Sequence, residues 1–176
     1  MRYKQLFSPE EWTLLLNSVF STILSYISID GKIDKGKLLS IAALSNEIVH
    51  IRNPLLQEVL LTENKNPVKA IQMTESSLDN LEEKLSNLSE LLLFKIDEAF
   101  TLDFKKSLLS ILFFLIFFNW PDKAPQTLNG DQKVLLSEII KYLKISVDDL
   151  KKQPDIKFIF SNYESVLLKI YDKYSD

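Results

Sequence analysis

Residues 108–118 read LLSILFFLIFF, and this stretch decides the fold that the rest of the chain must accommodate. Only Ser110 interrupts the run, so a helix here is apolar on every side, and such a helix lies either inside a protein core or in a membrane. The run is shorter than the roughly 20 apolar residues that a bilayer span requires. We therefore expect a buried central helix over about Phe104 to Asn119. The flanking Lys105 and Lys106 leave lipid contact as the alternative if the helix is exposed.

The composition is typical of one globular domain. The chain has 176 residues, of which 46% are hydrophobic and 26% charged, with a net charge of -3. A basic face is the usual mark of nucleic-acid binding, so the acidic excess argues against that partner. Cysteine is absent, which excludes disulfides and thiolate metal sites. We find no secretory signal in residues 1–7 and no integral membrane segment, and we expect a cytoplasmic protein.

Helical spacing and helix starts recur along the chain, and we predict an all-α single domain over residues 1–176. Ser8-Pro9-Glu10-Glu11 predicts an N-cap and capping box for a helix that ends near Ile29. Asn53-Pro54 predicts the start of a short helix over Leu55 to Leu61. Further starts are predicted at Asp34, Asn66-Pro67, Thr101 to Asp103, Asp131, Ser146, and Pro154 or Asp155.

A heptad-like row of leucines marks the middle of the chain. Its members recur at steps of three and four residues and are Leu78, Leu81, Leu85, Leu88 and Leu92. Such a row indicates either a coiled-coil interface or a helix packed into its own bundle. Packing within the bundle is the simpler interpretation, because two to three heptads are short for a coiled coil. Docking of a partner or a second copy along this leucine seam remains the alternative.

Two regions repeat the order of an apolar helix, an acidic loop and an amphipathic helix. In the first, residues 27–34 (ISIDGKID) precede Leu38-Leu39-Ser40, and in the second, residues 118–131 precede Leu135-Leu136-Ser137. Aligning the two Leu-Leu-Ser triplets places Asp34 over Asp131. An internal repeat is one explanation of this alignment, and a chance match between two short stretches is the other.

The repeated arrangement resembles the TerB-like family, helical domains associated with bacterial tellurite resistance. Asp30-Gly31-Lys32-Ile33 is similar to the family's first acidic loop, and residues 130–146, ending in Leu143-Lys144-Ile145-Ser146, are similar to its second-half helix. The likeness covers about Ile23 to Asn46 and Ile111 to Leu150. It leaves the middle, residues 54–93, as an extra helical segment. The resemblance implies a helical bundle around the buried apolar helix and a non-enzymatic stress-response or sensing role.

The resemblance also implies a metal site, because divalent-cation binding has been suggested for the family's acidic loops. The positions that carry over are Asp30, Asp34, Asp122 and Asp131. The chain departs from the pattern where Lys37 replaces an expected Glu and where Lys123 follows Asp122 ahead of an insertion. A hard cation needs about six to eight oxygen ligands, so backbone carbonyls or water would complete the shell. The alternative is that these carboxylates only cap helices and sit in solvated turns.

The remaining polar residues do not define a reaction. His50 is the only histidine, it lies near a predicted helix end, and zinc sites draw on several His or Cys ligands. An EF-hand is excluded because Lys32 and Ile41 occupy two of its ligand positions. The phenylalanines around Phe113 are better read as core than as a ligand pocket. We therefore hypothesise a non-enzymatic module acting through an acidic inter-helix surface. The alternative is a helical protein–protein interaction module without metal, and nothing favours an enzyme.

Overall fold

The computed structural model describes residues 3–29, 31, 35–62, 80–118, 129–146 and 148–149. Within these ranges the chain forms helices joined by turns and contains no strand, which confirms the all-α prediction. The elements are η1 (Tyr3–Leu6), α1 (Pro9–Ile27), α2 (Lys35–Glu47), η2 (Ile48–His50), α3 (Pro54–Thr62), α5 (Leu81–Lys95), α6 (Glu98–Phe118) and α7 (Gly130–Tyr142). The predicted helical residues from Val68 to position 79, and the last helix from Pro154 or Asp155, lie outside the described residues.

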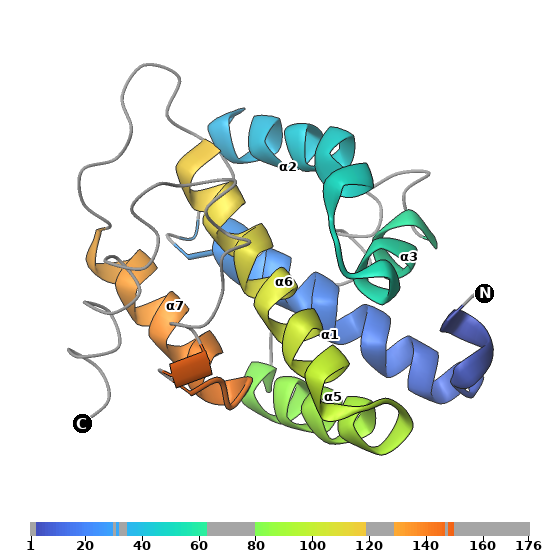
Figure 1. Ribbon diagram of the computed structural model, residues 1–176. Coiled ribbons are helices and arrows are strands. Elements are labelled where there is room, and N and C mark those ends of the chain that lie inside the picture. The colour runs from blue at the N-terminus through green and yellow to red at the C-terminus, as the bar shows by residue number, and fades with distance from the viewer. Residues whose placement is uncertain are drawn as a thin grey trace.

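Helix α6 is the central element of the fold. Helices α1, α2, α3, α5 and α7 all pack against it, so it is covered from several sides (Figure 1). Six of its side chains have no solvent exposure: Phe104, Leu108, Leu109, Leu112, Phe113 and Leu115. This burial confirms the prediction of a core helix. None of the described helices combines the length and the apolar character needed to cross a bilayer.

The start of α6 differs from the sequence prediction. Thr101 and Asp103 were expected to open the helix, but it begins at Glu98. Asp97 provides the cap: the backbone N–H of Phe100 donates to Asp97 Oδ1 at 2.8 Å, and the N–H of Thr101 donates to the Asp97 carbonyl at 3.0 Å. Asp97 satisfies N–H groups that a helix start leaves without intrahelical partners. The helix is therefore longer at its N-terminal end, and Thr101 lies inside it.

The start of α1 is the one that the sequence predicts. The N–H of Glu11 donates to Ser8 Oγ at 3.2 Å, and the N–H of Ser8 donates to Glu11 Oε2 at 2.7 Å. Pro9 occupies the first helical turn. This reciprocal pair is a capping box, and it satisfies two backbone donors at once. Local sequence alone therefore fixes where this helix begins.

The leucine seam packs inside the chain's own core. Leu85, Leu88 and Leu92 are 0% exposed, and α5 packs against α1, α6 and α7. Ser18 on α1 approaches α5 closely enough for its Oγ to donate to the carbonyl of Lys84 at 3.2 Å. These three leucines are therefore occupied within one chain and offer no open seam to a partner. Leu78 lies outside the described residues.

The end of α7 is held by a tight turn. Lys144 has a φ of 53°, in the left-handed region that a C-terminal capping residue commonly adopts. The N–H of Ile145 donates to the carbonyl of Ile140 at 3.1 Å, and the N–H of Lys144 donates to that of Lys141 at 2.9 Å. This pair of bonds is the Schellman motif. Ile145 and Ile140 are both buried, so the turn is anchored in the core.

Candidate functional site

The predicted site depends on where α1 and α6 end. The two helices pack against each other and run in the same general direction in Figure 1. Their C-terminal ends, Ile27 and Phe118, therefore point to the same end of the bundle, next to α2, which packs on α6. The chain segments that carry Asp30, Asp34 and Asp122 follow directly from these ends. We call this part of the molecule the acidic end.

Most of the predicted metal ligands lie outside the described residues: Asp30, Asp34 and Asp122 are among them. Asp131 is exposed in the first turn of α7, beside a capping box in which Asn129 Oδ1 accepts from the N–H of Gln132 at 2.8 Å. A carboxylate there is stabilised by the positive end of the helix dipole. Asp131 therefore has a structural role of its own. Its use as a metal ligand stays a prediction.

The first acidic segment leaves α1 through a turn that requires glycine. The N–H of Ser28 donates to the carbonyl of Leu24 at 2.9 Å and ends the helix, and the N–H of Gly31 donates to the carbonyl of Ser28 at 2.9 Å. Gly31 has a φ of +68°, which costs glycine little and costs other residues about 1 kcal/mol or more. The glycine at position 31 is thus explained by backbone geometry before any ligand is considered.

Lys37 places a positive charge at the acidic end. Its side chain is only 5% exposed, and its Nζ donates to the carbonyl of Ile27 at 2.8 Å. The last carbonyls of a helix lack intrahelical donors, and an ammonium at that position also complements the negative end of the dipole. Lys37 therefore caps α1 from within α2. A cation bound to the same carbonyl end would be repelled by this ammonium.

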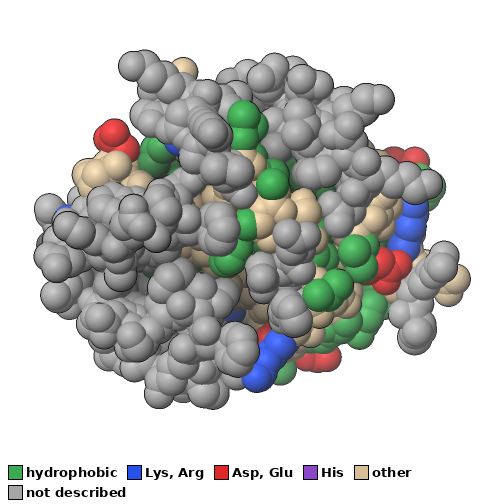
Figure 2. All heavy atoms as spheres, turned by 90° about the horizontal axis from the view of Figure 1, so that it is seen from above, with side chains coloured by type: hydrophobic (Ala, Val, Ile, Leu, Met, Phe, Trp, Pro, Cys, Tyr) green, Lys and Arg blue, Asp and Glu red, His purple; other side chains and the backbone are tan. Residues whose placement is uncertain are grey.

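The described carboxylates are dispersed rather than gathered. On the face shown in Figure 2, the visible Asp and Glu side chains lie apart from one another. Within the ranges that the structure describes, no group of three or more His, Cys, Asp or Glu side chains is arranged to hold a metal ion. Any cation site at the acidic end would therefore have to draw on residues 30–34 or 119–128.

The sequence analysis also singled out the phenylalanines around Phe113 and the histidine His50. Phe113 is fully buried, which confirms that it belongs to the core rather than to an open pocket. The side chains of Phe117, Phe118 and Trp120 lie outside the description. His50 is the last residue of η2, near a helix end as expected, and its side chain also lies outside the description.

Lys105 is a buried amine that the sequence interpretation missed. Its side chain is 6% exposed, and no described residue forms a hydrogen bond or ion pair with it. Burial lowers the pKa of the Lys105 ammonium below its ordinary value of 10.5, the charge of Lys144 lowers it further, and Asp149 and Glu98 raise it. Lys105 shares a heptad-spaced stripe with buried Thr101 and Leu108, and this spacing was the available signal. The lysine pair was instead taken as a polar flank of the apolar run.

Lys105→Met is expected to stabilise the protein near neutral pH by about 1 kcal/mol, because it removes a buried charge and keeps most of the side-chain volume. A pKa lowered on folding means that the unfolded chain binds more protons than the folded one between the two pKa values. Burial of the charged Lys105 ammonium therefore destabilises the folded state most at pH values below its pKa in the folded state. This destabilisation is lost as the pH rises from that pKa to above 10.5, the pKa of an ordinary lysine. Thermal melts of both proteins from pH 7 to 10.5 should show the advantage of the variant shrinking.

The exposed residue Lys141 on α7 supplies the control for this experiment. Lys141→Met should change the melting temperature little at any of these pH values, because surface substitutions usually stay within about 0.5 kcal/mol. An advantage of Lys105→Met that stays constant up to pH 10.5 would contradict the assignment of its effect to charge burial.

No protein-family model, no curated protein and no solved structure matches this chain.

Proposed function

We propose that this chain is a non-enzymatic, TerB-like module of a bacterial stress response, related to tellurite resistance, which acts through its acidic end. The observation that carries the proposal is the common direction of α1 and α6. In the sequence, each of these helices is followed by a segment that contains aspartates and then by a further helix, α2 or α7. Carboxylates brought together from both segments would suit a divalent cation or a basic region of a partner protein.

The packing of the following helices supports this proposal. Helix α2 follows α1 in the chain but packs on α6, whereas α7 follows α6 and packs on both α6 and α1. Helices from the two sequence regions are therefore interlocked in one bundle. A ligand bound by both aspartate-containing segments would act on helices whose relative positions are already fixed by this packing, so the free energy of ordering those helices would not be lost.

Lys37 sets a limit on cation affinity in the proposal. Its ammonium lies against the carbonyl end of α1, so an ion held by Asp30 or Asp34 would bind close to an existing positive charge. A cation is therefore expected to bind weakly, and Lys37→Gln is expected to tighten its binding. A basic partner surface would meet the same repulsion.

The test is a titration of the full chain with Ca²⁺, Mg²⁺, Mn²⁺ and Zn²⁺ while the melting temperature is recorded. A ligand at 100 times its Kd stabilises the folded state by about 2.7 kcal/mol, which for a chain of this size raises the melting temperature by roughly 5–10 °C. Asp30→Asn combined with Asp122→Asn should abolish the shift, and the exposed Asp148→Asn should leave it intact. The absence of a shift with all four ions would remove the cation from the proposal.

A further inference from the structure

The N-terminal segment is fastened across the end of the bundle opposite the acidic end. We call residues 3–7, which comprise η1 and Phe7, the strap. The carboxylate of Glu58 on α3 accepts the N–H of Tyr3 at 2.7 Å and that of Lys4 at 3.4 Å. The Tyr3 ring stacks on Phe100 of α6 with a centroid distance of 5.4 Å and an interplanar angle of 28°. The strap therefore bridges α3 and α6.

The other end of the strap covers Trp12 of α1. The rings of Phe7 and Trp12 are 6.0 Å apart, and Lys4 Nζ lies 5.6 Å from the centroid of the Trp12 ring. Phe7 is buried, Tyr3 is half-buried, and residues 4–6 are exposed. Two aromatic side chains four positions apart thus insert into the bundle, while the intervening side chains face solvent.

Two buried polar atoms, one on α1 and one on α6, lack hydrogen-bond partners among the described residues. Trp12 Nε1 and Thr101 Oγ1 are buried, and neither finds a donor or acceptor among the described residues. Trp12 is 3% exposed and Thr101 is 1% exposed. An unpaired buried polar group costs roughly 1–3 kcal/mol, so such atoms call for an explanation.

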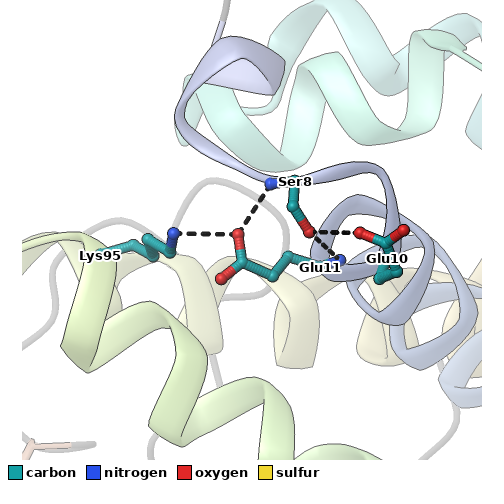
Figure 3. Close-up of polar contacts among 4 residues, drawn as sticks. All are labelled: Ser8, Glu10, Glu11 and Lys95. Atoms are coloured by element: carbon teal, nitrogen blue, oxygen red, sulfur yellow. Dashed lines mark hydrogen bonds and ion pairs between the residues drawn. The ribbon is translucent and has the colours of Figure 1, made fainter.

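Trp12 is the one of these two residues that the strap contacts, through the Phe7 ring and Lys4 Nζ. Glu11, which precedes Trp12, forms an ion pair with Lys95 at the end of α5, and Lys95 Nζ lies 2.9 Å from Glu11 Oε2 (Figure 3). The strap covers the Trp12 ring and its backbone N–H groups bind Glu58, but no described residue accepts the hydrogen of Trp12 Nε1.

We propose that the strap occupies a peptide-binding site formed by α1, α3 and α6, and that it blocks this site until a partner peptide displaces it. The partner is a peptide segment with two aromatic residues four positions apart. Its backbone N–H groups would bind Glu58 as those of Tyr3 and Lys4 do. A backbone carbonyl would reach Trp12 Nε1, which the strap leaves without an acceptor. This site lies away from the acidic end, so the proposal of a peptide-binding site does not depend on the proposed function.

The structure suggests how the two occupants compete. The polar attachment of the strap to α3 is two backbone hydrogen bonds to one carboxylate, and its attachment to α6 is one ring stack. A partner that makes the same contacts and also accepts a hydrogen bond from Trp12 Nε1 would gain an interaction that the strap lacks. Substitutions that weaken the strap without altering the site should therefore raise the affinity for an added peptide.

The experiment uses the full chain with Trp120→Phe, so that Trp12 is the only tryptophan. The probe is a synthetic peptide with the sequence of residues 1–8, MRYKQLFS, and binding is followed by Trp12 emission. We expect the chain that carries both Tyr3→Ala and Phe7→Ala to bind this peptide at least tenfold more tightly than the parent chain does. A peptide with alanine at both aromatic positions should not bind. The exposed Leu6→Ala should behave as the parent.

Two further variants make the outcome decisive. Tyr3→Ala alone removes a half-buried ring, and this variant should bind the peptide with an affinity between those of the parent and the double variant. It replaces the double variant in the test if the loss of Phe7 prevents folding. Glu58→Gln, added to either strap variant, should weaken peptide binding at least fivefold. The proposal is overturned if strap variants with a native helical circular dichroism spectrum do not bind the peptide, or bind it no more tightly than the parent does.

Discussion

Leu92→Ala should lower the free energy of unfolding by about 3 kcal/mol, within the roughly 2–5 kcal/mol found for leucines truncated in protein cores. Leu92 is 0% exposed on α5, which packs against α1, α6 and α7, so these helices cannot all move to fill the space left behind. For a chain of this length the melting temperature should fall by roughly 6–12 °C. Thermal melts and urea unfolding of the parent and the variant measure the change.

The neighbouring Leu93 provides a matched control. It is the same residue type on the same helix, but it is 50% exposed, so Leu93→Ala should cost less than about 1 kcal/mol. Similar losses for the two variants would contradict the placement of the seam in the core. A loss for Leu92→Ala that depended on protein concentration would instead point to the coiled-coil alternative, because only an intermolecular contact is stabilised by mass action.

The leucine seam shows what periodicity can and cannot predict. Spacing of three and four residues identifies one apolar face of a helix, because these positions lie above one another on the helix surface. It carries no information about which chain supplies the opposing surface. The capping box at Ser8 was predicted in full, since all its atoms come from residues 8–11. Local geometry is encoded locally, and packing partners are not.

The buried lysines illustrate the opposite case. Lys37 and Lys105 were read as polar positions, yet they are 5% and 6% exposed. A lysine has a long apolar stem that packs like an aliphatic side chain when its end reaches an acceptor or solvent. The acceptor of Lys37 is the carbonyl of Ile27, which belongs to a different helix. Sequence alone gives the charge of such a residue but not the helix end that accepts it.

The candidate site stays a prediction. Helices α1 and α6 pack together and end toward the same side of the bundle, but α7 packs on α6 whereas α2 packs mainly on α6 rather than on α1, so the equivalence of the two halves that the repeat predicts is not established. The meeting of the acidic segments themselves stays a prediction, because three of the four aspartates lie outside the described residues. The strap had no sequence signal at all, since Glu58 and Tyr3 are 55 positions apart.

Asn53→Ala should be the most damaging polar substitution in the described part of the chain, with an expected loss of about 2 kcal/mol. Asn53 is fully buried and serves two elements at once. Its Oδ1 accepts the N–H of Leu56 at 3.0 Å and so caps α3, as the Asn53-Pro54 pair predicted. Its Nδ2 donates to Asp103 Oδ2 on α6 at 2.8 Å, a contact between distant residues that no local pattern shows.

A double-mutant cycle separates these two roles. Asp103→Ala leaves the α3 cap intact and should cost about 1 kcal/mol, because only the bond between helices is lost. In the Asn53→Ala background, removal of Asp103 should cost much less, since its carboxylate has already lost its donor. The coupling free energy from the four unfolding curves should be about 1 kcal/mol. A coupling near zero would mean that the bond does not hold α3 to α6, and that capping accounts for the whole effect of Asn53.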